Sequence, residues 1–405
     1  MAGTSPGRPG RGDTPAIYQR RRLIAGAVVL VLLVVIGLAF WDGEDANVAD
    51  APRDPDEVLA RQREEKPVRF TVSVSGDLLI HSPVFERALA IGGGRRYDFT
   101  PMFGQVRPYV KGVDLAFCHV ETSMGPGPPQ GYPIFNTPPE LAQAIARTGW
   151  EACSTASNHA IDQGQEGIDG TIEALDRAGV KHTGTYASQK ASSKPLILGV
   201  KGVRVAYIAY TTDTNGIPLP HQWSVDLAES PKPIIAAARR ARKKGADGVI
   251  VNVHWGIDQT PEFVGEPSSK QRAFVKPLVD ARSITAIVGQ GPHVVQSIDR
   301  IDRKYVVFSE GNLVSNQGSA VGLAAASQDG LIGLLDLVVD GDGARVKRVR
   351  YVPTWVQQPD YTVLPVGPAL EAGDADAGAL RASYERTVDV AGRGKGIEPV
   401  PPKLP

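Results

Sequence analysis

The sequence predicts an α/β fold that becomes α+β in its C-terminal part. From Val68 onward, short β-branched runs alternate with amphipathic segments, which is typical of a largely parallel sheet covered by helices. Later in the chain, pairs of β-runs are joined by turns of the Asp-Gly type, which indicate antiparallel hairpins. The expected domain therefore contains mixed sheets, with parallel strands first and antiparallel strands later.

The first half alternates strands with helices. Strands are expected over residues 68–75, 113–120 and 151–157. Two helices are expected to open at Thr100 and Thr137, because each cap-capable Thr is followed by Pro at the first helical position. A further helix is expected over residues 166–179, ending at Gly179.

The second half is expected to open with a hairpin around Lys201-Gly202. Its two strands are predicted over residues 195–200 and 203–211. The elements that follow are a helix at 234–245, a strand at 248–256, a helix at 269–281, a strand at 284–292, and hairpins within 294–312 and 331–356.

The composition gives no reason to expect a nucleic-acid partner. The 405 residues, enough for one large or two modest domains, carry 44 Lys+Arg and 44 Asp+Glu, so the formal net charge is zero. Proteins that bind nucleic acid usually show a basic excess or a basic stripe. We therefore exclude nucleic acid from the expected partners.

An uncharged apolar stretch predicts one transmembrane helix over residues 23–41. It reads LIAGAVVLVLLVVIGLAFW, and as a helix it can cross a hydrocarbon core roughly 30 Å thick. Arginines precede it within residues 1–22 and acidic residues follow it, so we expect a single-pass protein of the cell membrane, with a cytoplasmic N-terminus and an extracytoplasmic main domain. The alternative is a cleaved signal peptide processed at Ala49-Asp50-Ala51, although its apolar core would exceed the roughly 7 to 15 residues usual for one.

Three further regions are expected after this helix. Residues 42–67 are acidic, contain Pro and are poor in aromatic residues, which is typical of a solvated flexible linker. The main domain is expected over residues 68–358. Residues 359–405 predict a C-terminal helix and a Pro-rich tail.

The two cysteines are too few for a disulfide framework. Cys118 lies in the run FCHV and Cys153 in the run ACST, and both runs are apolar. Small buried thiols are therefore the favoured interpretation, and a single bridge is the alternative.

Polar side chains follow several of the apolar strand runs. In open α/β sheets, ligands bind outside the carboxyl ends of the strands, so these side chains are the first candidates for a site. They are Asp77, His119, Glu121, Asn158, His159, His254, Gln290, His293 and Asn312. Carboxylates, imidazoles and an amide oxygen on one rim would suit a divalent metal ion.

Six blocks of sequence, taken in order, resemble the capsule synthesis proteins of the poly-γ-glutamate (CapA) family. The blocks are SGDLLIH, DLAFCHVETSM, ASNHAIDQGQEGIDGTIEALDRAGVKHTGT, VNVHWGID, VGQGPHVVQSI and FSEGNLVSNQ. The resemblance covers roughly Val68 to Val356, and SNHAIDQG and GPHVVQ are its most distinctive parts. It implies a domain similar to the calcineurin-like metallophosphoesterases, with a mixed β-sheet sandwich flanked by helices.

The resemblance also implies a site with one or two divalent metal ions. The implied metal ligands are Asp77, Glu121, Asn158, His254 and His293. The implied substrate contacts are His119, Gln290 and Asn312. The implied catalytic residue is His159, which would transfer protons near neutral pH.

The chain departs from the family pattern at three places. Leu79 stands where metallophosphoesterases have histidine, and Gln290 stands where this family often has histidine. His119-Val120 precedes Glu121 where the family commonly has Asn-Leu. A glutamine oxygen binds divalent transition ions less well than imidazole, so two metals, one metal and none all stay open.

Three functions follow from this combination. The first is a metal-dependent hydrolase or transferase acting on an anionic cell-envelope polymer, poly-γ-glutamate or a similar one. The second is a non-catalytic component that binds or anchors such a polymer beside a membrane-bound synthase complex. The third is a structural envelope protein with a relict site.

Other polar residues are interpreted without a functional role. Asp162 and Asp169 are expected to be turn and helix N-terminal residues. His182 is expected to be an ordinary surface or loop residue. The basic helix face around Lys243 and Lys244 is expected to be solvated.

Overall fold

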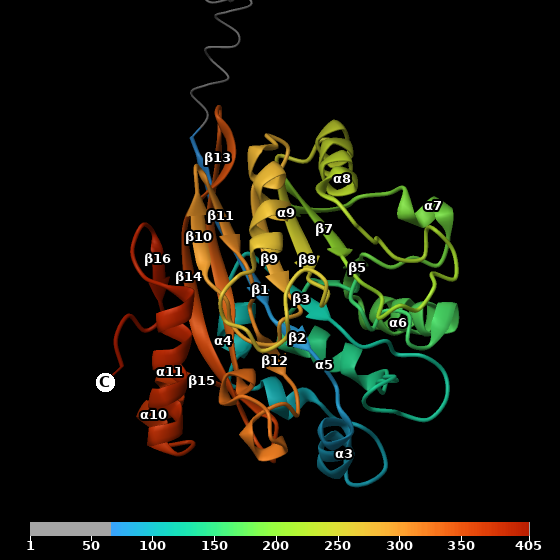
Figure 1. Cartoon of the computed structure of the whole chain (residues 1–405), viewed down its shortest axis with the longest axis vertical. Coiled ribbons are helices and arrows are strands. Elements are labelled where there is room, and N and C mark those ends of the chain that lie inside the picture. The colour runs from blue at the N-terminus through green and yellow to red at the C-terminus, as the bar shows by residue number, and fades with distance from the viewer. Residues whose placement is uncertain (1–65, 405) are drawn as a thin grey trace, which may run out of the picture. The chain divides into compact units, whose positions relative to one another are not determined.

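A computed structural model gives the fold of residues 66–404 (Figure 1). The predicted transmembrane helix at 23–41 lies outside these described residues, as does nearly all of the predicted linker. Within residues 66–404, no helix is both long and apolar enough to cross a membrane. The domain can therefore be described from its first strand onward.

Two β-sheets form the centre of the described domain. The strands of the larger sheet are β1 (Val68–Ser75), β2 (Asp77–Leu78), β3 (Leu115–Val120), β4 (Ala152–Ser154), β5 (Lys181–Thr183), β12 (Asn312–Val314), β13 (Asp329–Asp340), β14 (Gly343–Gln357), β15 (Thr362–Pro365) and β16 (Ile397–Pro399). The strands of the smaller sheet are β6 (Leu196–Val200), β7 (Val203–Thr211), β8 (Gly248–His254), β9 (Ala286–Gln290), β10 (Ile298–Ile301) and β11 (Lys304–Val307).

The order of the strands confirms the predicted mixed α/β fold. The larger sheet runs β12-β2-β3-β1-β13-β14-β15, with β16 beside β14 and with β4 and β5 continuing from β3. The smaller sheet runs β10-β11-β9-β8-β7-β6. Strands β1 to β5 pair in parallel, as do β7, β8, β9 and β11, whereas β6–β7, β10–β11 and β13–β14 are antiparallel hairpins.

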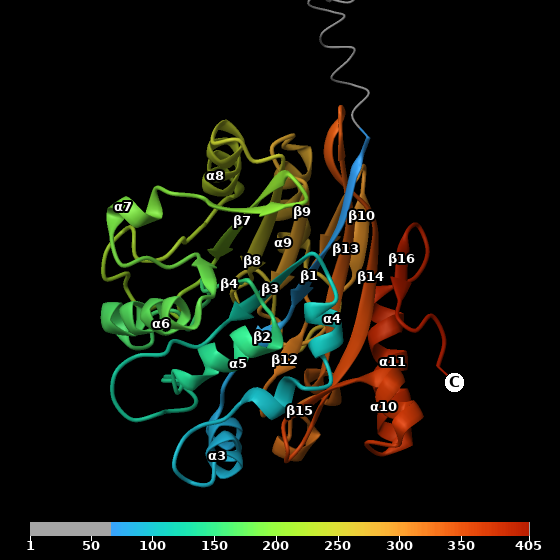
Figure 2. The ribbon, with the colours of Figure 1, turned by 180° about the vertical axis from the view of Figure 1, so that it is seen from behind.

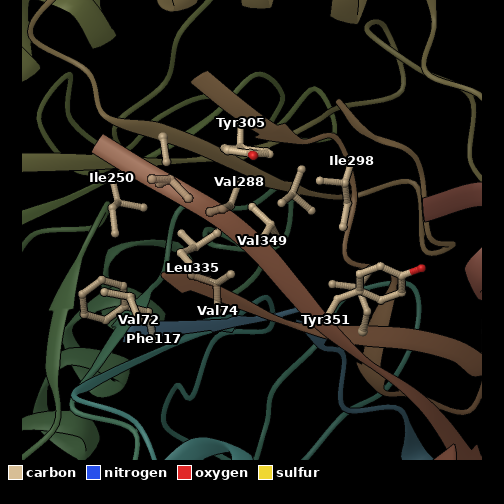
Figure 3. Packing of buried hydrophobic residues seen from close by; sticks show 14 of the residues in the cluster. Val72, Val74, Phe117, Ile250, Val288, Ile298, Tyr305, Leu335, Val349 and Tyr351 are labelled. Atoms are coloured by element: carbon tan, nitrogen blue, oxygen red, sulfur yellow. The ribbon is translucent and has the colours of Figure 1, made fainter. Parts of the chain in front are cut away.

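Apolar side chains from both sheets fill the space between them. Val72 in β1, Phe117 in β3 and Leu335 in β13 belong to the same buried cluster as Ile250 in β8 and Val288 in β9 (Figure 3). These side chains recur at alternate strand positions, which turn toward one face of a sheet. Because both sheets contribute to one core, their strand ends are held in fixed positions relative to each other.

Helices cover the outer faces of the two sheets (Figure 2). On the larger sheet they are α3 (Ser82–Ile91), the 3₁₀ turn η1 (Thr100–Phe103), α4 (Arg107–Lys111), α5 (Glu140–Thr148) and α6 (Gly164–Ala178). On the smaller sheet they are α8 (Pro231–Lys243) and α9 (Ser269–Asp280). Short segments are α7 (Gln189–Ser192), η2 (Ser319–Val321) and η3 (Ala325–Gln328).

Two local differences from the expected helices have physical causes. The helix expected to open at Thr100 is split into η1 and α4, because Gly104 weakens it and Pro108 lacks a backbone donor. Helix α3 had no counterpart among the expected elements. It follows the buried apolar run at residues 78–80, ends before the glycine-rich stretch at residues 92–94, and buries Val84, Phe85 and Ala88.

The C-terminal segment is more ordered than the sequence predicted. Residues 359–404 contain β15, α10 (Val366–Ala372), α11 (Ala377–Ala391) and β16, rather than one helix and a Pro-rich tail. Helix α11 buries Leu380, Tyr384 and Val388 in the central cluster, and β16 pairs in parallel with β14. The Pro and Gly content of this segment concealed a strand whose pairing partner is fixed only by the tertiary structure.

The two cysteines are paired, in contrast to the favoured interpretation of separate buried thiols. Cys118 in β3 lies opposite Cys153 in β4, and the structure joins them by a disulfide with the Cα atoms 4.4 Å apart. The sequence did not reveal that β3 and β4 are neighbours, so it could not favour this pairing.

An ion pair between α11 and β13 offers a test of the C-terminal packing. Arg386 donates hydrogen bonds of 2.7 and 2.9 Å to the two oxygens of Asp329, which is 2% exposed. In Arg386→Ala the buried carboxyl loses this partner, so we expect the free energy of unfolding to fall by about 1–3 kcal/mol in urea titrations. The control Glu385→Ala, on the exposed side of α11, should change it by less than about 0.5 kcal/mol. Equal losses in both variants would contradict this account.

Candidate metal centre

The carboxyl ends of strands from both sheets meet at one rim. In the larger sheet, Asp77 of β2 lies opposite His119 of β3 on one side and opposite Asn312 of β12 on the other. In the smaller sheet, His254 at the end of β8 lies opposite Gln290 at the end of β9. Parallel strands end at the same edge of a sheet, so residues far apart in sequence converge there.

Gly76 allows the chain to reach this rim. The backbone amide of Asp77 donates to the carbonyl oxygen of Gly311 at 3.0 Å, which joins β2 to the segment before β12. A Cβ atom at Gly76 would lie 2.0 Å from that same oxygen. Only glycine therefore permits this close approach of the two backbones.

The first group of potential ligands consists of Asp77, His119 and His254, all of them buried. Nε2 of His119 lies 2.9 Å from Nδ1 of His254, and these two atoms lie 3.7 and 3.9 Å from Oδ1 of Asp77. Nδ1 of His119 lies 2.6 Å from the hydroxyl of Ser154, which fixes the orientation of the ring. One oxygen and two nitrogens therefore converge on one point.

The second group consists of Asp77, Glu121 and His293, which are also buried. Nδ1 of His293 lies 3.2 Å from Oδ2 of Asp77, and Nε2 of His293 lies 3.7 Å from Oε1 of Glu121. Asp77 thus belongs to both groups, with Oδ1 toward the first and Oδ2 toward the second. The arrangement offers two adjacent positions for a cation that share one carboxylate.

The buried oxygens of these groups fit a cation. Oδ1 of Asp77 and both carboxylate oxygens of Glu121 have no hydrogen-bond partner among the described residues. Buried carboxylates without a partner are costly and rare in folded proteins. Imidazole nitrogens with carboxylate oxygens suit divalent transition metals such as Zn²⁺ or Mn²⁺. We conclude that the residues present fit one or two divalent metal ions.

The pKa values of the histidines in the cluster are shifted in opposite directions, down for His119 and His254 and up for His293. Burial lowers the pKa of His119 to about 4 and the pKa of His254 well below its usual value. Burial also disfavours the charged form of His293, but Glu121 and Asp77 outweigh it and raise the pKa of His293 to about 10. Burial raises the pKa of Glu121. His119 and His254 are therefore already in the neutral form that ligates metals.

His159 is oriented by a carboxylate that the sequence analysis interpreted as a turn residue. Nδ1 of His159 lies 2.7 Å from Oδ2 of Asp162, and the same oxygen accepts a 2.7 Å hydrogen bond from the backbone of Phe135. The ring of Phe135 also packs edge-on against His159, with the centroids 4.7 Å apart. The three-residue spacing of His159 and Asp162 was the signal available in the sequence. Nε2 is left as the atom of His159 that can exchange a proton.

The surroundings of Asn158 agree in part with its implied role as a metal ligand. It is half-buried, and its Nδ2 donates to Oδ1 of Asn215 at 3.2 Å. Its own Oδ1 is buried and has no hydrogen-bond partner among residues 66–404. The side chain is therefore held through its nitrogen while its oxygen is available, and its role as a metal ligand stays a prediction.

The three residues expected to contact substrate are buried. His119, Gln290 and Asn312 are each at most 1% exposed. His119 belongs to the first ligand group, and Asn312 donates to the carbonyl of Ser327 and lies 3.2 Å from Nδ1 of His293. Their geometry suits support of the cluster better than contact with a polymer. The substrate-binding role stays a prediction.

The structure adds Glu310 to the cluster, a residue that the sequence analysis missed. Its Oε2 accepts a 2.6 Å hydrogen bond from Nε2 of Gln290, and burial together with the charge of Asp77 raises its pKa. The signal in the sequence was a carboxylate two residues before Asn312 and two residues after Phe308, where an apolar run ends. Leu79, at the position where metallophosphoesterases have histidine, is 2% exposed and part of the core.

A cavity of about 360 Å³ adjoins the cluster on the side of His293. Phe263, one of its walls, has its ring centroid 6.2 Å from that of His293. Burial lowers the pKa of His81, another wall, to about 4, so this ring is neutral. None of the eight lining residues is Lys or Arg, and one of them, Glu262, is acidic. The lining of this cavity is therefore not basic.

Comparison with known proteins identifies the family. Residues 71–317 match the family described as "Bacterial capsule synthesis protein PGA_cap". The "Capsule biosynthesis protein CapA" of Bacillus anthracis is 29% identical over 303 residues, which cover 72% of this chain and 68% of that protein. The "PGA biosynthesis protein CapA" of Bacillus subtilis is 28% identical over 181 residues, which cover 44% of this chain and 46% of that protein. The second match thus spans about half the length of the relative.

A solved structure with a similar chain path is the calcineurin-like phosphoesterase YfkN of Bacillus subtilis. It aligns with 80% of this chain and 99% of its own, at 12% identity and a TM-score of 0.45. The architecture is defined by the strand order given above. The family match is different in kind, because it covers more than half of the chain and includes every strand end of the rim. The protein therefore belongs to the bacterial capsule synthesis protein family.

Proposed function

We propose that the protein acts in the synthesis or export of a capsule polymer of the poly-γ-glutamate type, as a metal-dependent hydrolase or transferase on that anionic polymer. The observation that carries the proposal is the pair of buried ligand groups that share Asp77. The capsule synthesis family supports the class of polymer. The names of the relatives, which refer to capsule and PGA biosynthesis, support it too.

The residues of the cluster would have separate roles in such a reaction. His119 and His254 on one side, and Glu121 and His293 on the other, would hold the cation or cations together with Asp77. A divalent cation supplies Lewis-acid charge that offsets negative charge on a reacting oxygen. The protein supplies the fixed geometry, because the rim belongs to one packed core.

His159 would move the proton. Asp162 holds Nδ1, so Nε2 is the site at which a proton is taken up or released. The edge-on contact with Phe135 keeps the ring from turning. A histidine held in this way is oriented to act as a general acid or base.

A second candidate is a non-catalytic component that binds or anchors the polymer beside a membrane-bound synthase. The observation in its favour is that Leu79, at the position where metallophosphoesterases have histidine, is buried in the core. Gln290, where the family often has histidine, is hydrogen-bonded to Glu310. A site with fewer strong ligands could hold a cation for structure or polymer binding without turnover.

The location proposed for the domain is extracytoplasmic, with a single membrane anchor. The support is the uncharged stretch 23–41, with arginines before it and acidic residues after it. An extracytoplasmic domain would face the polymer as it leaves a membrane-bound synthase.

Metal content is the first test of the proposed function. The full chain, purified in detergent and loaded with Mn²⁺ or Zn²⁺, should retain one or two equivalents by elemental analysis, because the buried carboxylates lack other partners. Asp77→Ala combined with His254→Ala should lose most of this metal. Asp169→Ala, on the exposed side of α6, should retain it. Absence of metal at every loading would rule the centre out.

Proton transfer by His159 is the second test. His159→Ala should lower the turnover of poly-γ-glutamate, followed by chain length, or of a phosphodiester by about 100- to 10,000-fold. Its metal content should not change, since His159 is outside both ligand groups. The control His182→Ala should behave as the wild type. Polymer binding without turnover in the wild-type protein would favour the non-catalytic candidate.

Topology is the third test. Protease added to intact spheroplasts should digest the main domain and leave a tag at the N-terminus protected, because the arginines keep that end in the cytoplasm. Deletion of residues 23–41 should leave the domain inside the cell. A mature chain that begins near residue 52 by mass spectrometry would show the cleaved signal peptide instead.

A further inference from the structure

A second cleft, with a basic lining, lies far from the metal centre. Its volume is about 440 Å³, and its walls come from the start of β1, the β6–β7 turn, β13 and β14. Five of the lining residues are cationic, and they are Arg69, Lys201, Lys347, Arg348 and Arg350. Arg69 and Asp77 are eight residues apart along the extended β1–β2 segment, so the two sites are roughly 25 Å apart. Figure 1 shows the start of β1 and the labelled β2 at opposite ends of this segment.

A β-bulge concentrates the cations on one wall. Along the β13–β14 pair, Arg348 lies opposite Asp336 while Val346 lies opposite Leu337, so the register skips Lys347. Alternation along a regular strand would turn Lys347 away from its neighbour, whereas an extra residue in the strand re-aims its side chain. Lys347, Arg348 and Arg350 consequently all line the same cleft.

The charge of the cleft is not balanced from within. The two acidic residues in its lining are Asp114, which lies 2.8 Å from Lys201, and Asp336, which Arg348 and Arg350 contact. Five cations against two carboxylates leave an excess of three positive charges in a chain whose formal net charge is zero. Outside the lining, Glu398 of β16 lies opposite Arg350 in the sheet.

Asp336 prepares the arginines for a further anion. Its carboxylate accepts a hydrogen bond of 2.5 Å from Nε of Arg348, one of 2.8 Å from Arg350 and one of 2.8 Å from the hydroxyl of Thr71. Each guanidinium has five donor hydrogens, so both arginines keep donors that Asp336 does not use. Holding the side chains in place also lowers the entropy cost of binding a second carboxylate.

We propose that this cleft binds a strand of an anionic polymer, a flexible polycarboxylate, at a site separate from the metal centre. The inference rests on the proposed function only for the identity of the polymer, since the charge of the cleft would attract any flexible polycarboxylate. The cavity beside His293 has no Lys or Arg in its lining, so attraction for a polyanion has to come from elsewhere on the domain. The cleft is concave and has cations on walls from both sheets, which suits a strand better than a flat membrane surface.

Fluorescence anisotropy with labelled poly-γ-glutamate tests this site on the full chain in detergent. The wild type should bind in 50 mM salt and more weakly in 500 mM salt, since exposed charges are screened. Arg69→Glu combined with Lys347→Glu, both at exposed positions, should weaken binding at least about tenfold. Lys243→Glu combined with Lys244→Glu, exposed at the end of α8, is the charge-matched control and should bind as the wild type. Absence of binding by the wild type, or equal weakening in both variants, would overturn the proposal.

Further arms separate the possible outcomes. Asp77→Ala combined with His254→Ala should bind the polymer normally, so a failed metal centre would not remove this binding. If the wild-type protein does not bind the polymer but has normal metal content and turnover, the proposal for the cleft is wrong and the proposed metal centre is unaffected. Soluble short-chain phosphatidylglycerol tests a membrane contact. If the Arg69 and Lys347 variant loses that lipid but keeps the polymer, the cleft is a lipid site and the proposal is wrong.

Discussion

The candidate site depends on the burial of Asp77 between two sets of imidazole and carboxylate donors. Its two oxygens face different partners, with His119 and His254 near Oδ1 and His293 near Oδ2. Oδ1 has no hydrogen-bond partner among the described residues, and the neighbouring Glu121 has none on either oxygen. A fold that buries these carboxylates away from water needs a compensating positive charge, and protonation supplies only part of it. This requirement explains why the metal centre fits the cluster better than a purely structural network would.

The two-sheet core makes this arrangement possible. Asp77 and His119 come from the larger sheet, whereas His254 and Gln290 end strands of the smaller one. Neither sheet alone holds a complete ligand group, because the first group needs His254 and the second needs His293 from the loop after β9. Packing between the sheets therefore sets the distances between the ligands. A substitution that disturbs the core far from the rim would change these distances.

The sequence allowed the rim to be predicted because each of its main residues follows an apolar strand run. Asp77, His254 and His293 needed only that pattern and the rule that ligands collect at the carboxyl ends of strands. Asp162 was misjudged because an Asp before a helix is usually explained by the helix itself, and its contact with His159 depends on a turn that the sequence does not specify.

Features that depend on neighbours in space were beyond the sequence. The pairing of Cys118 with Cys153 requires β3 to lie beside β4, and the exposure of Lys347 requires a bulge whose register is set by β13. The parallel pairing of β16 with β14 is of the same kind. Each of these features is a strand pairing or register that depends on the tertiary structure and not on local sequence propensity.

The formal net charge of zero conceals a separation of charge along the domain. The rim concentrates buried carboxyls, including Asp77 and Glu121, and its adjoining cavity adds Glu262. The excess of cations lies at the other end of β1, around Arg69 and Lys347. An anionic polymer would be repelled by the rim unless cations there offset the carboxyls, but attracted by the basic cleft under any metal loading. The two proposals made for this domain therefore place recognition of the polymer and chemistry on it at separate sites, so the proposed reactive rim need not be basic.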